Sequence, residues 1–320
     1  MRKKSALLLI VVSVIIVSLV LGFFITVKES RVIKIKGNFF NVLAELNSPE
    51  DWRNWQGLLK QDYTKDPSLY EVNGDSSSPG FYIKTSDHSF YVQKLSAVSF
   101  DVKEVTNEDT LFYNISVLST VLPTYTNLVT TTRVNLFDYL LFNHSDSNAF
   151  STANYLKSFI ENPSAYYGYS FTIEKTIDTV VVVKETIVAK RNWQQELSSL
   201  YKSLYSFIDR NHLKIMQPKI VSFKPISIDS FRIRAGIPVN KVAPEIDNIR
   251  CLKMPKANIL VGEYQGRYDK RTSLSTAMEK YIRDHSLDEI ALPYEKFLND
   301  SIPETDTSIV TIKMYYPVLN

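Results

Sequence analysis

The sequence predicts an α+β fold with two soluble domains behind an N-terminal transmembrane helix, and three observations predict it. Residues 5–27 are apolar and carry no charge. Alternating strand patterns flanked by helical patterns follow over residues 30–165. A β-α-β-β pattern then occurs twice over residues 166–320. The expected organisation is therefore a transmembrane anchor over 1–29, a first domain over 30–165 and a second domain over 166–320.

The anchor is predicted from the length and composition of the segment Ser5–Val27, which is nearly all Leu, Ile and Val. At about 1.5 Å per residue it is long enough to cross a hydrocarbon core of about 30 Å. A cleaved signal peptide is the alternative, but its apolar region is usually only about 7–15 residues long and ends in small residues. Here the run ends in Gly22-Phe23-Phe24-Ile25. We therefore expect an uncleaved anchor in a membrane protein.

The charges beside this segment bear on its orientation. Basic residues lie on both sides of it: Arg2, Lys3 and Lys4 before, and Lys28, Arg31, Lys34 and Lys36 after. The positive-inside rule is therefore nearly balanced. Because a very short basic tail usually stays in the cytoplasm, we expect a single-pass protein whose body lies on the outer, periplasmic side.

The overall composition argues against several function classes. The net charge is +3 and the charged fraction is 22%, scattered evenly, which does not favour nucleic acid as a partner. Cys251 is the single cysteine, so no intramolecular disulfide is expected. The four histidines are dispersed without metal-ligand spacing. No metal site, cofactor or catalytic residue is assigned.

The first domain is predicted from a strand, helices, a run of strands and a last helix. Residues Arg31–Lys36 alternate as a strand does. Ser48-Pro49 marks the start of a helix that carries Trp52 and Trp55. Strand patterns then run from Leu69 to about Val134, and a helical pattern covers Asn148–Ile160. This order indicates an antiparallel sheet curled round a long helix.

The second domain is predicted from an internal repeat. Strand patterns at Thr179–Val183 and Asn258–Tyr264 are each followed by an amphipathic helix and two further strands. Both copies end in Pro-Val, at residues 238–239 and 317–318. A duplicated unit of this kind predicts pseudo-twofold symmetry, with a cleft where the two halves meet.

These residues carry two resemblances. The segments Gly262–Tyr268, Pro293-Tyr294-Glu295 and Tyr316-Pro317-Val318 resemble the GyrI-like effector-binding domain. That family implies a duplicated β-α-β-β fold that binds small, often aromatic or cationic molecules in a central cleft, with an acid at the position of Glu295. Because no DNA-binding helix-turn-helix pattern precedes the domain, we do not expect a transcription factor.

The segment Arg31–Pro163, with Asp51–Trp55, resembles the SRPBCC (START-like, polyketide cyclase-type) superfamily. That resemblance implies a helix-grip fold with a hydrophobic cavity between the sheet and the last helix. Trp52 and Trp55 would cover one mouth of the cavity or pack in the core. Six sheet rings would line the cavity or fill it: Phe81, Tyr82, Phe90, Tyr91, Phe112 and Tyr113.

Glu295 is the leading candidate for a ligand-binding residue. A carboxylate among aromatic rings could pair with a ligand's positive charge while the ring faces add cation–π attraction. The alternative is an exposed strand acid. Four aromatic residues are assigned to the same cleft, each with core packing as its alternative role: Tyr264, Tyr268, Tyr294 and Trp193.

The sequence thus predicts a membrane-tethered protein that binds a small hydrophobic or cationic ligand in the GyrI-like cleft. A second hydrophobic ligand could occupy the SRPBCC-like cavity. One alternative is a hydrolase of a small electrophilic compound, with Glu295 as general acid/base. Another is an interaction module in which both cavities are filled.

Overall fold

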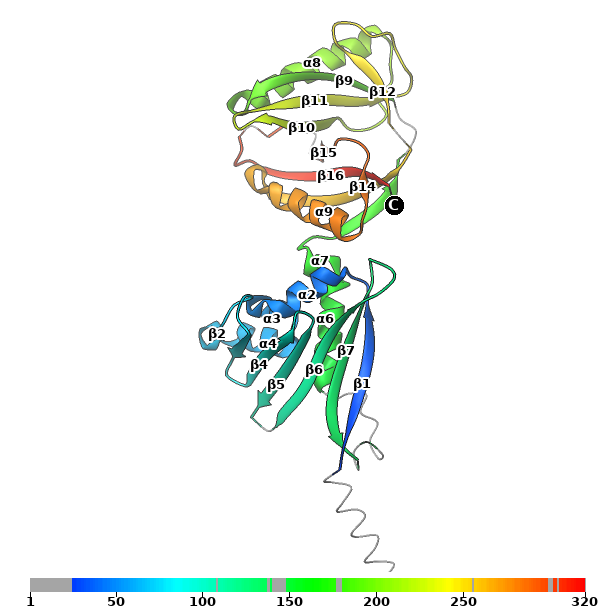
Figure 1. Ribbon diagram of the computed structural model, residues 1–320. Helices are drawn as coiled ribbons and strands as arrows, with labels where there is room; N and C mark the ends of the chain where they lie inside the picture. The colour runs from blue at the N-terminus through cyan, green and yellow to red at the C-terminus, as the bar shows by residue number, and fades with distance from the viewer. Residues whose placement is uncertain are drawn as a thin grey trace, which may run out of the picture. The chain divides into compact units, whose positions relative to one another are not determined.

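The structure is a computed structural model that describes residues 25–107, 109–136, 139, 148–176, 180–254, 256–298, 302–303 and 305–319. The chain divides into two compact units, Met1–Asn162 (unit 1) and Pro163–Asn320 (unit 2). Each unit is built on one antiparallel sheet with helices packed against it (Figure 1).

The described residues correct the expectation of an N-terminal membrane helix. Within them, no helix is both long and apolar enough to cross a bilayer. Most of Ser5–Val27 lies outside the described residues, and Thr26 and Val27 already belong to strand β1 (Thr26–Ile35). These residues form a strand because β1 pairs along its whole length with β7 (Thr126–Asn135), which satisfies its backbone groups. The predicted fold class was therefore wrong in its transmembrane helix: the fold supported is α+β with two antiparallel sheets.

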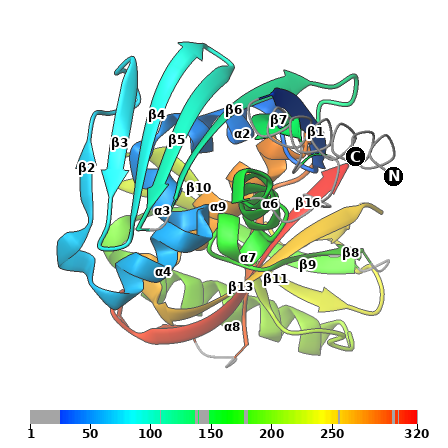
Figure 2. The same cartoon turned by 90° about the horizontal axis from the view of Figure 1, so that it is seen from below.

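Unit 1 consists of a seven-stranded sheet and the helices that pack on it. The strand order is β1-β7-β6-β5-β4-β3-β2, so the first strand pairs with the last. Figure 2 shows β2, β3, β4 and β5 side by side in this order. The long helix α6 (Asn148–Ile160) packs against β1, β7 and β6. The other elements are α2 (Phe39–Asn47), α3 (Pro49–Trp55), α4 (Gly57–Lys65), β2 (Glu71–Asn73), β3 (Gly80–Lys84), β4 (His88–Ser96), β5 (Ser99–Thr106) and β6 (Thr110–Ser119).

The six sheet rings of unit 1 are divided between the two faces of the sheet. Phe81, Phe90 and Tyr113 are buried, as expected for the face that packs on the helices. Their neighbours along the strands turn the other way, and Tyr91 and Phe112 are exposed. The strand period of two therefore places half of these rings in the core and half on the opposite face.

The inward rings of unit 1 pack against the tryptophan pair. Trp52 and Trp55 are buried, with ring centroids 4.7 Å apart. The Trp52 ring also lies 5.9 Å from Phe81 and 5.8 Å from Phe90. Both indole N–H groups donate to backbone carbonyls of α2, at 3.1 and 3.3 Å. Core packing, one of the two roles predicted for Trp52 and Trp55, is the role that the structure shows.

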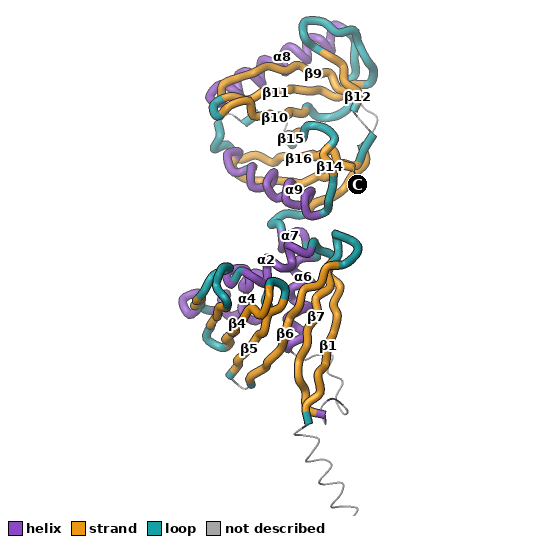
Figure 3. Tube along the Cα trace, viewed as in Figure 1, coloured by secondary structure: helices purple, strands orange, loops and turns teal. Residues whose placement is uncertain are grey.

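Unit 2 is built on a nine-stranded sheet. Eight strands follow the order β12-β9-β11-β10-β15-β16-β13-β8, and β14 pairs with β16. Figure 3 shows β9, β11, β10, β15 and β16 as successive strands. The elements are α7 (Pro163–Tyr166), β8 (Phe171–Lys175), β9 (Val180–Ala189), η3 (Lys190–Asn192), α8 (Trp193–Arg210), β10 (Ile220–Ser227), β11 (Ser230–Val239), β12 (Arg250–Lys253), β13 (Asn258–Arg267), η4 (Tyr268–Lys270), α9 (Thr272–Asp284), β14 (Asp288–Glu289), β15 (Tyr294–Phe297) and β16 (Ile309–Leu319).

The strand order of unit 2 is that of two repeats related by a pseudo-twofold axis. The first repeat contributes β9-β11-β10 and the second contributes β13-β16-β15, and they meet where β10 pairs with β15. The outer strands are exchanged. β8, which precedes the first repeat, pairs with β13 of the second, and β12, which precedes the second, pairs with β9 of the first.

The pairing registers show which residues of the two repeats are equivalent. Val221 of β10 is the direct partner of Glu295 of β15, and these residues pair onward with Ala235 and Met314. Counting along β11 and β16 from these partners brings the two Pro-Val endings into coincidence.

The same counting through β9 and β13 makes the short helices η3 and η4 equivalent. It thereby makes Lys190 the counterpart of Tyr268, and Trp193 the counterpart of Arg271. Each residue of η4 and of the start of α9 therefore has an equivalent position in the first repeat.

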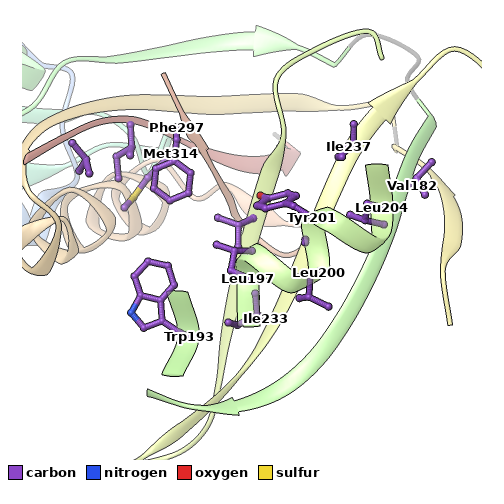
Figure 4. Packing of buried hydrophobic residues seen from close by; sticks show 14 of the residues in the cluster. Val182, Trp193, Leu197, Leu200, Tyr201, Leu204, Ile233, Ile237, Phe297 and Met314 are labelled. Atoms are coloured by element: carbon purple, nitrogen blue, oxygen red, sulfur yellow. The ribbon is translucent and has the colours of Figure 1, made fainter. Parts of the chain in front are cut away.

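A large buried cluster contains residues of both repeats. Leu197 and Leu204 of α8 pack with Ile233 of β11, and the same cluster contains Phe297 and Met314 of the second repeat (Figure 4). Because this core spans both repeats, it holds the residues at their junction in a fixed arrangement.

Candidate functional site

A cleft of about 620 Å³ lies in unit 2 where the repeats meet. The first repeat contributes residues from η3, α8, β10 and β11 to its wall, and the second contributes residues from η4, α9, β15 and β16. Its aromatic lining consists of Trp193, Phe223, Phe231, Tyr268, Tyr294 and Tyr316. A cleft of this size is within the range of about 300–1,000 Å³ that is usual for small-molecule sites.

Glu295 lines this cleft. Strand β15 places it opposite Val221, and the residue is only 9% exposed. Arg271 donates from Nε to Glu295 Oε1 at 3.0 Å. The Tyr268 hydroxyl donates to Glu295 Oε2 over a longer 3.4 Å. The acid is therefore a buried, partnered carboxylate and not an exposed strand residue.

The Arg271 side chain contacts rings as well as the carboxylate. Its guanidinium carbon lies 3.8 Å from the centroid of the Tyr268 ring and 5.5 Å from that of Phe223. Nη1 also donates to the Tyr268 carbonyl at 3.3 Å. These contacts combine a charge-assisted hydrogen bond with cation–π attraction.

The Tyr268 ring packs against two other aromatic rings, Trp193 and Phe297. Trp193 stacks on it with centroids 4.9 Å apart and an interplanar angle of 23°. Phe297 lies 6.1 Å from it. Phe223 meets Trp193 edge-on at 5.5 Å. The result is a rigid aromatic layer beside the carboxylate, built from both repeats.

Burial sets the electrostatics of this group. It raises the pKa of Glu295, while the charge and hydrogen bond of Arg271 act in the opposite direction. Burial and the nearby Glu295 charge also hold the pKa of the Tyr268 phenol well above its usual range, so this hydroxyl remains a donor. The cleft thus contains a carboxylate whose charged form depends on a positive neighbour.

Asp306, between β15 and β16, fastens the aromatic layer to the opposite repeat. Its Oδ1 accepts from Trp193 Nε1 and from Gln194 Nε2, both at 3.2 Å. Its carbonyl accepts from the Asp269 N–H at 2.8 Å. One residue therefore connects the starts of the two equivalent helices.

The four wall carboxylates all have partners within the protein. Glu295 pairs with Arg271, Asp269 with Arg267, Asp306 with Trp193, and Glu279 accepts from the Tyr316 hydroxyl. Among the described residues, no group of three or more His, Cys, Asp or Glu side chains could hold a metal ion.

The structure brings together Glu295, Tyr268, Tyr294 and Trp193, which the sequence assigned to one cleft. The fifth predicted residue, Tyr264, does not line this cleft, and its hydroxyl donates to the Arg267 carbonyl at 2.7 Å. Their roles in binding a ligand stay predictions.

Sequence reasoning missed Arg271 and Asp306. For Arg271 a signal was present, because it is the first residue after the Gly262–Tyr268 motif and η4, at the start of the second repeat's helix. For Asp306 the sequence offers no comparable signal, since it lies in an irregular segment whose path is set only by the fold.

Comparison with known proteins gives structural neighbours only. No protein-family model matches the sequence, and no curated protein matches it. Among solved structures, the C-terminal domain of EcmrR shares 16% identity, covers 48% of this chain and 98% of its own, and has a TM-score of 0.36.

Two further neighbours cover 47% of this chain. A hydrolase from Listeria innocua is 8% identical over 92% of its own length, with a TM-score of 0.36. SAV2435, solved bound to tetraphenylphosphonium, is 15% identical over 94% of its length, with a TM-score of 0.31. Likenesses of this degree do not establish a shared function.

Proposed function

We propose that unit 2 is a GyrI-like small-molecule-binding domain that takes a hydrophobic or cationic ligand in the cleft between its repeats. The observation that supports this most is the buried Glu295 carboxylate, beside a layer of stacked rings in a cleft of about 620 Å³. Apolar walls with a few convergent polar groups are the usual composition of ligand sites. A buried carboxylate and ring faces both attract positive charge.

Thermal denaturation of the full chain tests this proposal with two matched probes. Tetraphenylphosphonium is a bulky apolar cation, and triphenylphosphine oxide is a neutral analogue. A probe at one hundred times its dissociation constant stabilises the protein by about 2.7 kcal/mol. We expect stabilisation by the cation to fall in Glu295→Gln. Glu263→Gln is the control, because Glu263 is an exposed acid on the same sheet. Equal stabilisation of all three proteins would refute the assignment of Glu295.

A hydrolase is the second candidate, and one observation favours it. Burial raises the pKa of Glu295, which is the direction that favours the protonated form of a general acid. Its Oε1, however, is held by Arg271. Turnover of an electrophilic substrate that is lost in Glu295→Gln while binding persists would select this candidate.

For unit 1 we propose membership of the SRPBCC superfamily, supported by its order of strand, helices, antiparallel strands and last helix. A second hydrophobic ligand there stays a prediction. The contacts among Trp52, Phe81 and Phe90 show that at least part of the interior is occupied by side chains.

A further inference from the structure

The positive charge that the cleft is suited to receive is already supplied by the protein. Arg271 makes both contacts expected of a bound cation: 3.0 Å from its Nε to the buried carboxylate and 3.8 Å from its guanidinium carbon to the Tyr268 ring. Both side chains of the pair are largely buried, at 19% exposure for Arg271 and 12% for Glu295.

Comparison of the repeats indicates that Glu295 and Arg271 form a unit. At the positions equivalent to Glu295 and Arg271, the first repeat has Val221 and Trp193. Both charges are thus replaced by apolar groups in one repeat and both are present in the other. This is the pattern expected if a buried carboxylate is tolerated here only with its own counter-ion.

A second cation cannot share this carboxylate with Arg271 without strong like-charge repulsion in a largely buried site. The guanidinium must therefore leave Glu295 before a cationic ligand can pair with it. Asp306 already interacts electrostatically with Arg271, so a displaced guanidinium has a second carboxylate on the cleft wall.

We propose that Arg271 is a built-in competitor for the ligand position at Glu295 and so determines the specificity of the cleft. Cationic ligands bind only by displacing it, whereas neutral aromatic ligands bind beside it. This inference rests on the proposed binding function and names the residue that regulates it.

Calorimetric titration of the full chain with the same two probes tests the competitor. Arg271→Met removes the charge. Arg271→Gln also removes it but keeps a donor for Glu295, and so serves if Arg271→Met does not fold. We expect either variant to bind tetraphenylphosphonium at least tenfold more tightly than the natural chain, with affinity for triphenylphosphine oxide unchanged within about twofold. Arg283→Met, an exposed change on the same helix α9, should alter neither affinity.

The double variant Arg271→Gln/Glu295→Gln should lose the gain for the cation. Equal or weaker cation binding in the Arg271 variants would overturn the inference, as would an equal gain for both probes, which would show that Arg271 only takes up space. If the neutral probe binds while the Arg271 variants show no gain, the binding function stands and the competitor falls. If no probe binds any variant, both fall.

Discussion

The two repeats of unit 2 share a backbone plan but differ at the two positions that meet in the cleft. In the first repeat Val221 and Trp193 occupy these positions, and in the second Glu295 and Arg271 occupy them. By contrast, helices α8 and α9 end with the same backbone geometry in the two repeats. Leu213 and Leu287 each donate to a carbonyl five residues earlier, and His212 and Ser286 both have positive φ.

This difference separates what builds the fold from what builds the site. The strand order and helix ends need only apolar alternation and turn geometry, and both repeats supply them. The first repeat adopts the same backbone arrangement without the charged pair, so the pair is not required for this fold. The second repeat therefore supplies the charged groups of the cleft, and the first repeat supplies the ring of Trp193 that packs beside them.

The largest expected effect comes from replacing Glu295 of the second repeat by valine, the residue at the equivalent position of the first. Glu295→Val leaves Arg271 largely buried without its partner, and breaking a buried pair in this way costs about 3–5 kcal/mol of unfolding free energy. The double variant Glu295→Val/Arg271→Met removes both charges and should regain stability to within about 1 kcal/mol of the natural chain. Urea denaturation measures both values.

The control for this pair is Glu263→Gln. Glu263 pairs with Lys313 at 3.8 Å, and both side chains are substantially exposed. Its loss should cost less than about 1 kcal/mol. A double variant as unstable as Glu295→Val alone would show that the two charges do not act as a unit.

A smaller effect is expected at the aromatic wall of the first repeat. Trp193→Phe keeps a ring against Tyr268 but removes the indole N–H that donates to Asp306 at 3.2 Å. We expect a loss of about 1.5–3 kcal/mol in urea denaturation, the usual contribution of a hydrogen bond to a charged group. Asp306→Asn, which keeps an acceptor oxygen, should cost less. Equal stability of Trp193→Phe and the natural chain would show that the hydrogen bond from Trp193 to Asp306 does not stabilise the protein.

The smallest effect concerns a buried acid that forms no ion pair with any of the residues that the structure describes. Glu104 of unit 1 is fully buried; the Tyr113 hydroxyl donates to its Oε2 at 3.3 Å, and among the described residues Oε1 has no hydrogen-bond partner. Burial raises its pKa, against opposing contributions from Tyr113 and His88. Because the folded-state pKa lies above the unfolded one, the neutral carboxyl's contribution is complete at low pH and is lost as pH rises through the folded pKa.

Glu104→Gln keeps an amide at this position that cannot ionise. We expect it to be more stable than the natural chain by about 1 kcal/mol above the folded pKa of Glu104, since an unsatisfied buried group costs about 1–3 kcal/mol. The advantage should vanish at acid pH. Thermal denaturation over a pH series measures it, and a constant difference at all pH values would contradict the ionisation of Glu104.

Much of the fold could be predicted because it depends on local patterns. Alternation predicted the strands, and the two Pro-Val endings predicted a duplication that the pairing registers place in equivalent positions. Strand β1 shows where local reasoning failed. The apolar composition of Ser5–Val27 outweighed the alternation that continues back to Thr26, and pairing with the distant β7 is not visible in a single segment.

The site was harder to predict than the fold because it is made of distant contacts. Tyr264 and Tyr268 belong to one motif, yet only Tyr268 lines the cleft: Tyr264 lies within β13, whereas Tyr268 begins η4. The ion pair joins residues 24 positions apart, on a helix start and a central strand. No sequence periodicity specifies such a contact. Aligning the two repeats could have indicated it, because the equivalent positions of the first repeat carry no charge.

We propose that Glu295 is the charged group that binds a cationic ligand in the cleft of unit 2. Calorimetric titration of tetraphenylphosphonium into the full chain and into Glu295→Gln tests it most directly. We expect measurable binding to the natural chain and affinity at least tenfold weaker in the variant, with triphenylphosphine oxide binding both equally. Equal affinity of the cation for the two proteins would contradict it.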